Sequence, residues 1–125
     1  MYEKEINRTF IQTREFSRQW EDLGFDDEDL RQLEIMIMQN PEAGVVMQGT
    51  GGLRKMRFAY EGRGKSGSAR VCYVDFVAFD TVYLITAFGK SQKANLTKAE
   101  RNNIKKAIDF LQEEIRQAHG GDRND

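Results

Sequence analysis

The sequence contains one cysteine, one histidine and one proline among its 125 residues. Cys72 has no partner for an internal disulfide, and with His119 it cannot supply the ligand set of a zinc site. No run of 18 apolar residues is present, and the first ten residues, MYEKEINRTF, carry charges where a signal peptide is apolar. We therefore expect a cytoplasmic protein that has no membrane segment and uses no metal or other cofactor.

The length and the 39% apolar content suit one hydrophobic core and are too small for two. We expect a single domain over residues 1–118. Residues 119–125 contain no apolar side chain that could anchor them, so we expect a flexible C-terminal tail. His119 lies in this stretch, and we assign it no catalytic role.

The net charge of −1 conceals a marked asymmetry. Residues 1–44 carry five basic and eleven acidic side chains, whereas residues 45–100 carry nine and four. Between positions 54 and 70 the only acidic residue is Glu61, and the basic ones are Arg54, Lys55, Arg57, Arg63, Lys65 and Arg70. Such a cluster attracts polyanions even in a protein that is nearly neutral overall. A solvated surface strip has the same composition, so charge alone does not identify a binding site.

Two helices are expected before residue 45. Thr13 can cap the first, which ends at Gly24, and the acidic run 26–29 favours the start of the second because carboxylates stabilise a helix N-terminus. The apolar positions are Phe16, Trp20 and Leu23 in the first helix and Leu30, Leu33, Met36 and Ile37 in the second. Asn40-Pro41 ends the second helix.

From Val45 onward the hydrophobic period changes to two, which indicates strands. In LRKMRFAY (53–60) the apolar Met56, Phe58 and Tyr60 alternate with Lys55, Arg57 and Ala59. This strand therefore has one apolar and one cationic face. The segments 69–79 and 81–88 are more uniformly apolar, as inner strands are, and are joined by a turn at Asp80-Thr81. A short first strand is expected over Glu5–Ile11.

A last helix is predicted from the capping box Thr97-x-x-Glu100. Its buried stripe is expected to be Ile104, Ala107, Ile108, Leu111 and Ile115, with Phe110 exposed. Together these elements predict an α+β fold, in which two N-terminal helices pack on a small antiparallel sheet that is followed by a C-terminal helix.

Two glycine-rich stretches have the composition of nucleotide-binding loops. AYEGRGKSGSAR (59–70) loosely fits a phosphate-binding loop, and QGTGG (48–52) resembles part of a dinucleotide-binding fingerprint. Both motifs need a helix directly after the glycines, because the helix N-terminus binds the phosphates. Here each stretch is followed by a strand pattern. We therefore reject nucleotide binding and expect residues 61–68 to form a hairpin connection.

The basic residues of the strand region suit RNA chemistry. Lys55, Arg57, Arg70, Lys90 and Lys93 lie on or next to three successive strands, so they can converge on one face or end of the sheet. RNA cleavage needs a polarised 2′-hydroxyl, neutralisation of the phosphorane-like transition state, and help for the leaving 5′-oxygen. Arginine offers two-pronged donors to phosphate, and lysine acts as a point charge or a base. The same cations could also only bind RNA.

Four segments occur together and in order: QGTGGLRKMR (48–57), GRGKSGSAR (62–70), YLITAFGK (83–90) and LTKAERNNIKKAIDFL (96–111). In combination they resemble the toxins of bacterial type II toxin–antitoxin pairs, the RelE/ParE superfamily and within it the HigB-like branch. The resemblance implies a RelE-like fold and an mRNA endoribonuclease that inhibits translation. Such toxins enter the vacant ribosomal A site and promote metal-independent attack of an mRNA 2′-hydroxyl on the neighbouring phosphate.

The resemblance also implies roles for individual residues. Lys55 and Arg57 match the basic strand pair, with base or phosphate-binding roles, and Arg70 matches the arginine that stabilises the transition state. We therefore expect catalytic roles for Lys55, Arg57, Arg70 and Lys90, and RNA contacts from Arg54, Arg63, Lys65 and Lys93. The implied partners are a cognate antitoxin, helix-turn-helix and HigA-like, together with the ribosome and its mRNA.

The sequence departs from this pattern at one place. Many relatives carry a tyrosine or histidine after the last strand as an acid or base, whereas this chain has Ser91, Gln92, Asn95 and Thr97 there. We expect Tyr73 and Tyr83 to pack in the sheet, so the general acid is not identified. The alternative is a non-catalytic member of the superfamily, which binds another target such as gyrase, or a phage-derived adaptor protein.

Overall fold

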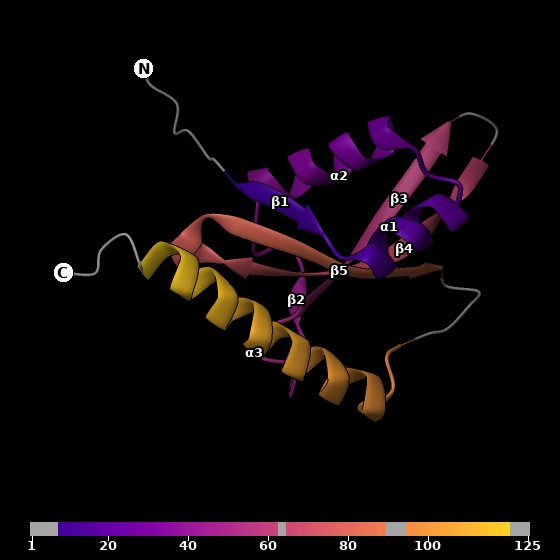
Figure 1. The fold of residues 1–125 in the computed structure, drawn as a ribbon. Helices are drawn as coiled ribbons and strands as arrows, with labels where there is room; N and C mark the ends of the chain where they lie inside the picture. The colour runs from indigo at the N-terminus through magenta and orange to yellow at the C-terminus, as the bar shows by residue number, and fades with distance from the viewer. Residues whose placement is uncertain (1–7, 63–64, 90–94, 121–125) are drawn as a thin grey trace, which may run out of the picture.

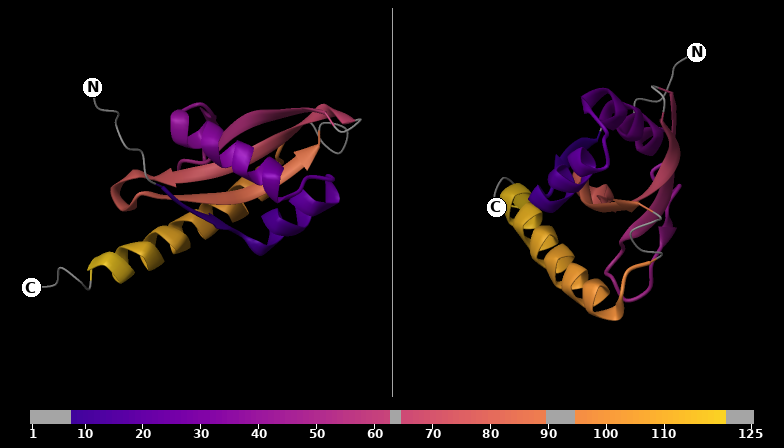
Figure 2. Two further views of the ribbon diagram at one scale, coloured as in Figure 1. Left: turned by 90° about the horizontal axis from the view of Figure 1, so that it is seen from above. Right: turned by 90° about the vertical axis from the view of Figure 1, so that its right-hand side faces the viewer.

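The computed structural model describes residues 8–62, 65–89 and 95–120. Over these residues a five-stranded sheet lies between α1 and α2 on one face and α3 on the other (Figures 1 and 2). The strands are β1 (Thr9–Gln12), β2 (Val45–Val46), β3 (Arg54–Gly62), β4 (Lys65–Phe76) and β5 (Thr81–Gly89). The helices are α1 (Arg14–Asp22), α2 (Asp27–Gln39), the short 3₁₀ helix η1 (Val77–Phe79) and α3 (Lys98–Gly120). The predicted α+β fold is confirmed.

The strand order is β1-β5-β4-β3-β2, and the meander β3-β4-β5 is antiparallel as expected. The edge strand β1 adds a feature that the sequence does not indicate, because it pairs in parallel with β5, from Thr9 opposite Thr81 to Gln12 opposite Leu84. The sheet as a whole is therefore mixed. β1 also begins later than the strand expected over Glu5–Ile11, whose first three residues lie outside the described ranges.

Helix α1 is capped and docked by the same residue. Thr13 Oγ1 accepts a hydrogen bond from Phe16 N at 3.0 Å and donates one to Ile85 O at 2.8 Å. Further along the helix, Gln19 Oε1 accepts hydrogen bonds from Thr86 Oγ1 at 3.0 Å and from Ala87 N at 2.9 Å. Thr13 and Gln19 thus form hydrogen bonds with backbone groups of β5 beyond the point where its pairing with β1 ends.

Helix α2 starts with a reciprocal cap, in which Asp26 and Asp29 each accept the other's backbone N–H at 2.9 Å. Leu33 and Ile37 are completely buried, but Met36 is 38% exposed, so its expected place in the buried stripe is wrong. At 100° per residue, Met36 lies roughly 90° around the helix from the centre of the stripe that contacts the sheet. The other predicted positions, Leu30, Leu33 and Ile37, do pack into the core between α2 and the sheet.

Alternate residues of the strands build two separate cores. The first lies under α1 and α2 and contains Phe16, Trp20, Leu33, Ile37, Met56, Phe58, Val71, Tyr73, Val82, Leu84 and Ala87. The second lies under α3 and contains Met47, Leu53, Cys72, Val74, Phe76, Ile85, Phe88, Leu96, Ile108 and Ile115. The strands are thus covered on both faces along much of their length, which explains their uniformly apolar sequences.

The ends of β4 are set by turn geometry. The strand expected over 69–79 stops at Phe76, because Val77–Phe79 turns as a 3₁₀ helix and Asp80 adopts a left-handed conformation with φ 51°. At the other end β4 starts at Lys65, opposite Gly62 of β3. The hairpin connection expected over residues 61–68 is therefore wrong at residues 61–62 and 65–68, which are paired strand. A strand and not a helix follows Lys65, whereas a phosphate-binding loop needs a helix there.

Helix α3 begins with the predicted capping box, in which Thr97 N donates to Glu100 Oε1 at 2.8 Å and Glu100 N to Thr97 Oγ1 at 3.1 Å. Phe110 is exposed as expected, but Ala107 is exposed as well, so it does not belong to the buried stripe. The helix continues through Gly120, beyond the boundary expected at Ala118. Residues 121–125, the rest of the predicted tail, lie outside the described ranges.

His119 is part of this extension. Its Nδ1 lies 3.0 Å from Ile115 O, and its ring centroid is 5.1 Å from that of Phe79. The last turn of α3 therefore packs against η1, at the far end of the sheet from the β3–β4 hairpin.

Candidate nucleic-acid interface

Three of the predicted site residues lie together on the α3 face of the sheet. Arg57 of β3 is directly opposite Arg70 of β4. Lys55 lies two residues before Arg57 and therefore projects from the same face. We call Lys55, Arg57 and Arg70 the cationic cluster. Residues opposite each other in an antiparallel pair have Cβ atoms about 5 Å apart, and like charges placed there repel.

Arg70 is the most enclosed member of the cluster. It is half-buried, and its Nη1 is inaccessible and has no hydrogen-bond partner in the part of the chain that the structure describes. Its neighbour across the other strand pair is the buried Phe88 of β5. A buried donor without an acceptor is costly, and an anion can supply the acceptor for this nitrogen only if the Arg70 side chain shifts to expose it.

Lys55 connects the cluster to the start of α3. Its Nζ donates a hydrogen bond to Asn95 Oδ1 at 3.2 Å, and the same oxygen accepts from Leu96 N at 2.9 Å. From the sequence, Asn95 is only one of several polar residues after the third strand. Its contact with Lys55 joins positions 40 residues apart, so a local sequence pattern could not predict it.

Arg54 is not part of this cluster. It is the cross-strand neighbour of Tyr73, on the α1/α2 face, and its Nη1 donates to Gly44 O at 2.8 Å and to Glu42 O at 3.4 Å. Arg54 thus holds the loop before β2, and the expectation that it lies with the RNA-binding residues is wrong. Its neighbour Lys55 belongs to the cluster and Arg54 does not, because successive side chains of a strand point to opposite faces.

The other predicted residues are less fully described. Lys65 is the first residue of β4, and the structure gives the placement of its backbone alone. Arg63, Lys90 and Lys93 lie outside the described residues. Their expected roles stay predictions.

Neither central tyrosine is suited to proton transfer at the cluster. Tyr73 Oη donates to Pro41 O at 2.8 Å and accepts from Gly44 N at 3.0 Å, and burial raises its pKa. Burial also raises the pKa of Tyr83, which packs edge-on against Phe76 with ring centroids 5.8 Å apart. Position excludes them from the cluster: Tyr73 Oη is bonded to a loop on the other face of the sheet, and Tyr83 lies opposite Val74, four residues along β4 from Arg70.

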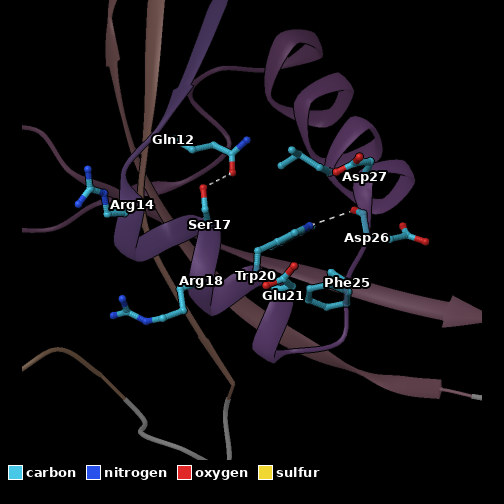
Figure 3. A pocket seen from close by; sticks show the side chains of 10 residues that line it. Gln12, Arg14, Ser17, Arg18, Trp20, Glu21, Phe25, Asp26 and Asp27 are labelled. Atoms are coloured by element: carbon cyan, nitrogen blue, oxygen red, sulfur yellow. Dashed lines mark hydrogen bonds between the residues drawn. The ribbon is translucent and has the colours of Figure 1, made fainter.

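A hollow of about 790 Å³ lies between α1 and α2, away from the cationic cluster (Figure 3). Arg14 and Arg18 stand on one side of it, and Asp26 and Asp27 on the other. Two hydrogen bonds brace its wall, from Ser17 Oγ to Gln12 Oε1 at 2.9 Å and from Trp20 Nε1 to Asp26 O at 3.1 Å. Its carboxylates would repel a polyanion, so this hollow is not the place where RNA fits best.

Two further findings concern the described part of the chain. Within residues 8–62, 65–89 and 95–120 there is no group of three or more histidine, cysteine, aspartate or glutamate side chains that could hold a metal ion. None of the helices in these ranges is both long and apolar enough to cross a lipid bilayer.

Comparison with known proteins gives a family. Residues 7–118 match the family described as the RelE toxin of the RelE/RelB toxin–antitoxin system. Among solved structures, a mutant of the E. coli toxin RelE in the free state is 14% identical, with 70% of this chain and 87% of that chain covered and a TM-score of 0.48. A metal-bound toxin from Helicobacter pylori is also 14% identical, with 68% and 97% covered and a TM-score of 0.39. Because the family match spans most of the chain, this protein belongs to the RelE toxin family and is the toxin of a toxin–antitoxin system.

Proposed function

We propose that this toxin is a ribosome-dependent mRNA endoribonuclease of the HigB-like branch, which cuts translated mRNA without a metal ion and so inhibits translation. The observation that carries the proposal is the juxtaposition of Arg57 and Arg70 beside Lys55 on the α3 face of the sheet. Repulsion between these cations is removed when a phosphate binds between them.

The proposed reaction is an internal transfer at one phosphodiester. The 2′-oxygen loses its proton and attacks the phosphorus, and the bond to the 5′-oxygen breaks. The products are a 2′,3′-cyclic phosphate and a 5′-hydroxyl, which takes up a proton. Arg57 and Arg70 neutralise the charge on the phosphorane, and Lys55 lies where it can act on the 2′-hydroxyl or on a phosphate oxygen.

The remaining assignments complete the proposal. Lys90 belongs to the catalytic set, and Arg63, Lys65 and Lys93 contact RNA outside the cleaved bond, as the family resemblance implies. Arg54 is left out, because its guanidinium is bonded to loop carbonyls on the other face. The partners are a helix-turn-helix antitoxin of the HigA type, the ribosome and its mRNA, all in the cytoplasm.

Expression in growing cells tests the proposal. The wild type and the exposed-surface control Arg18→Ala should both arrest growth, and primer extension should reveal new cuts within translated reading frames. Arg70→Ala should abolish the cuts and the arrest, because removal of one donor to the transition state costs about 100- to 1,000-fold in rate. Arrest without cuts, or equal toxicity of Arg70→Ala, would instead favour a non-catalytic toxin that binds a target such as gyrase.

A further inference from the structure

A second hollow, of about 490 Å³, lies where the turn before β3 meets the first turns of α3. The described residues that line it are Gln48, Gly49, Leu96, Lys98, Arg101 and Asn102. Two are cations, two are amides and none is a carboxylate. This composition differs from that of the hollow between α1 and α2, whose lining includes three acidic side chains. The α3 hollow therefore favours an anionic ligand.

The wall of the α3 hollow is held by one backbone hydrogen bond and by the side chain of Thr50. Met47 N donates to Leu53 O at 2.8 Å, and the buried Thr50 links Met47 O at 2.6 Å with Leu53 N at 3.0 Å. Gly49 has a φ of 75°, which favours glycine. The turn that carries Gln48 is thus fixed before any ligand arrives.

Arg101 lacks a complete set of partners. Its Nε is inaccessible and, among the residues that the structure describes, has no hydrogen-bond acceptor. The nearby Glu100 is not among the described residues that line the hollow, and its carboxylate accepts the N–H of Thr97 in the capping box. Arg101 is therefore not fully hydrogen-bonded by the described residues, and a guanidinium at the wall of a hollow can donate to a phosphate through its terminal nitrogens.

The α3 hollow is linked to the cationic cluster through Asn95. Lys55 Nζ bonds to Asn95, the residue directly before Leu96, and Leu96 lines the hollow. An RNA strand whose cleaved phosphate lies between Arg57 and Arg70 can therefore pass Lys55 and reach the start of α3.

On the basis of the proposed function, we infer that the α3 hollow binds a neighbouring nucleotide of the RNA substrate. Arg101 and Lys98 bind its phosphate, and Gln48 and Asn102, which each offer a donor and an acceptor, bind its base or sugar. Arg101 is thus a positioning residue, which fixes the register of the strand over the cationic cluster.

Binding of free single-stranded RNA tests this inference. Fluorescence anisotropy is measured with labelled all-2′-O-methyl oligonucleotides of two and of six residues, which cannot be cleaved because the attacking hydroxyl is blocked. Arg101→Ala should weaken hexamer binding about three- to tenfold. It should also lower the slope of log K against log salt concentration by about 0.7, the value expected when the protein neutralises one phosphate fewer on a single strand. Dinucleotide binding should change less than twofold.

The matched control is Lys106→Ala, which removes one positive charge from the exposed part of the same helix, outside the hollow. It should leave both oligonucleotides unaffected. Arg101→Gln, which removes the charge but keeps a polar, unbranched side chain, should weaken binding as much as Arg101→Ala and have a melting temperature no lower than that of the wild type. Equal weakening by Lys106→Ala, or weakening that does not depend on RNA length, would overturn the inference.

Lys55→Ala separates this inference from the proposed function. It should weaken binding of both oligonucleotides. If it does so while Arg101→Ala behaves like the control, only the α3 subsite is refuted. If Lys55→Ala has no effect either, RNA binding by the cationic cluster fails and the subsite fails with it. An effect of Arg101→Ala on ribosome binding alone would assign Arg101 to ribosomal RNA and would also refute the substrate subsite.

Discussion

The two faces of the β3–β4 hairpin are made from alternate residues of the same strands, yet the cationic cluster lies on only one of them. On the α1/α2 face, Met56, Phe58 and Val71 are buried under aromatic side chains of the helices. On the α3 face, Lys55, Arg57 and Arg70 lie among residues of the second core, because Lys55 is opposite the buried Cys72 and Arg70 is opposite the buried Phe88. Both faces thus contribute to a core, but the α3 face also holds neighbouring cations in a repulsive arrangement, which a bound anion relieves.

Among the substitutions that test this comparison, Trp20→Ala should cause the largest change, which is a loss of stability. Trp20 is 4% exposed, and its ring lies 4.4 Å from that of Phe25 and 5.4 Å from that of Phe58. Its truncation should lower the free energy of unfolding by about 3–5 kcal/mol, as measured by urea denaturation. RNA affinity per folded molecule should not change. A lower affinity of the folded variant would show that the two faces are not independent.

Tyr73→Phe should have a smaller effect on the same face. It leaves Gly44 N and Pro41 O without their partner, so the free energy of unfolding should fall by about 1–3 kcal/mol. Because burial raises the pKa of Tyr73, the unfolded chain ionises first, and the wild type should lose stability as the pH rises above about 10. The phenylalanine variant should lack that part of the decrease. An identical alkaline pH dependence of the two proteins would contradict the assigned cause.

On the α3 face, Lys55→Ala should act on RNA and not on stability. It should make the salt dependence of RNA binding shallower, by about 0.7 in the slope of log K against log salt, because the protein displaces the counterions of one phosphate fewer. Arg18→Ala, on the exposed side of α1, serves as the control and should leave the slope unchanged. An unchanged slope for Lys55→Ala would mean that Lys55 does not face RNA.

The smallest and most diagnostic effect is expected from Arg57→Thr. Removal of one member of the like-charged pair should raise the free energy of unfolding by about 0.2–1 kcal/mol at low salt, and the gain should shrink as salt screens the charges. RNA affinity should fall at the same time. A higher free energy of unfolding together with a lower RNA affinity would confirm that the like-charged pair destabilises the fold and serves ligand binding. A decrease in both quantities would show that Arg57 has a structural partner.

The sequence by itself determined the elements and much of the cluster. Caps at Thr13, Asp26 and Thr97 act through hydrogen bonds within a few residues, so local patterns suffice to place helix starts. The alternation in β3 puts Lys55 and Arg57 on one face because strand side chains alternate strictly. The order of four segments identified the family that the wider comparison then showed.

Tertiary structure alone decided which distant residues meet. Local patterns could not show the parallel pairing of β1 with β5, the register that sets Arg57 opposite Arg70, or the Lys55–Asn95 hydrogen bond. Nor could they show that Arg54, adjacent to Lys55 in sequence, holds a loop on the other face, or that Arg101 lines a hollow with Gln48. Periodicity reports only which side of its own element a residue occupies, whereas contacts between elements depend on how the whole chain packs.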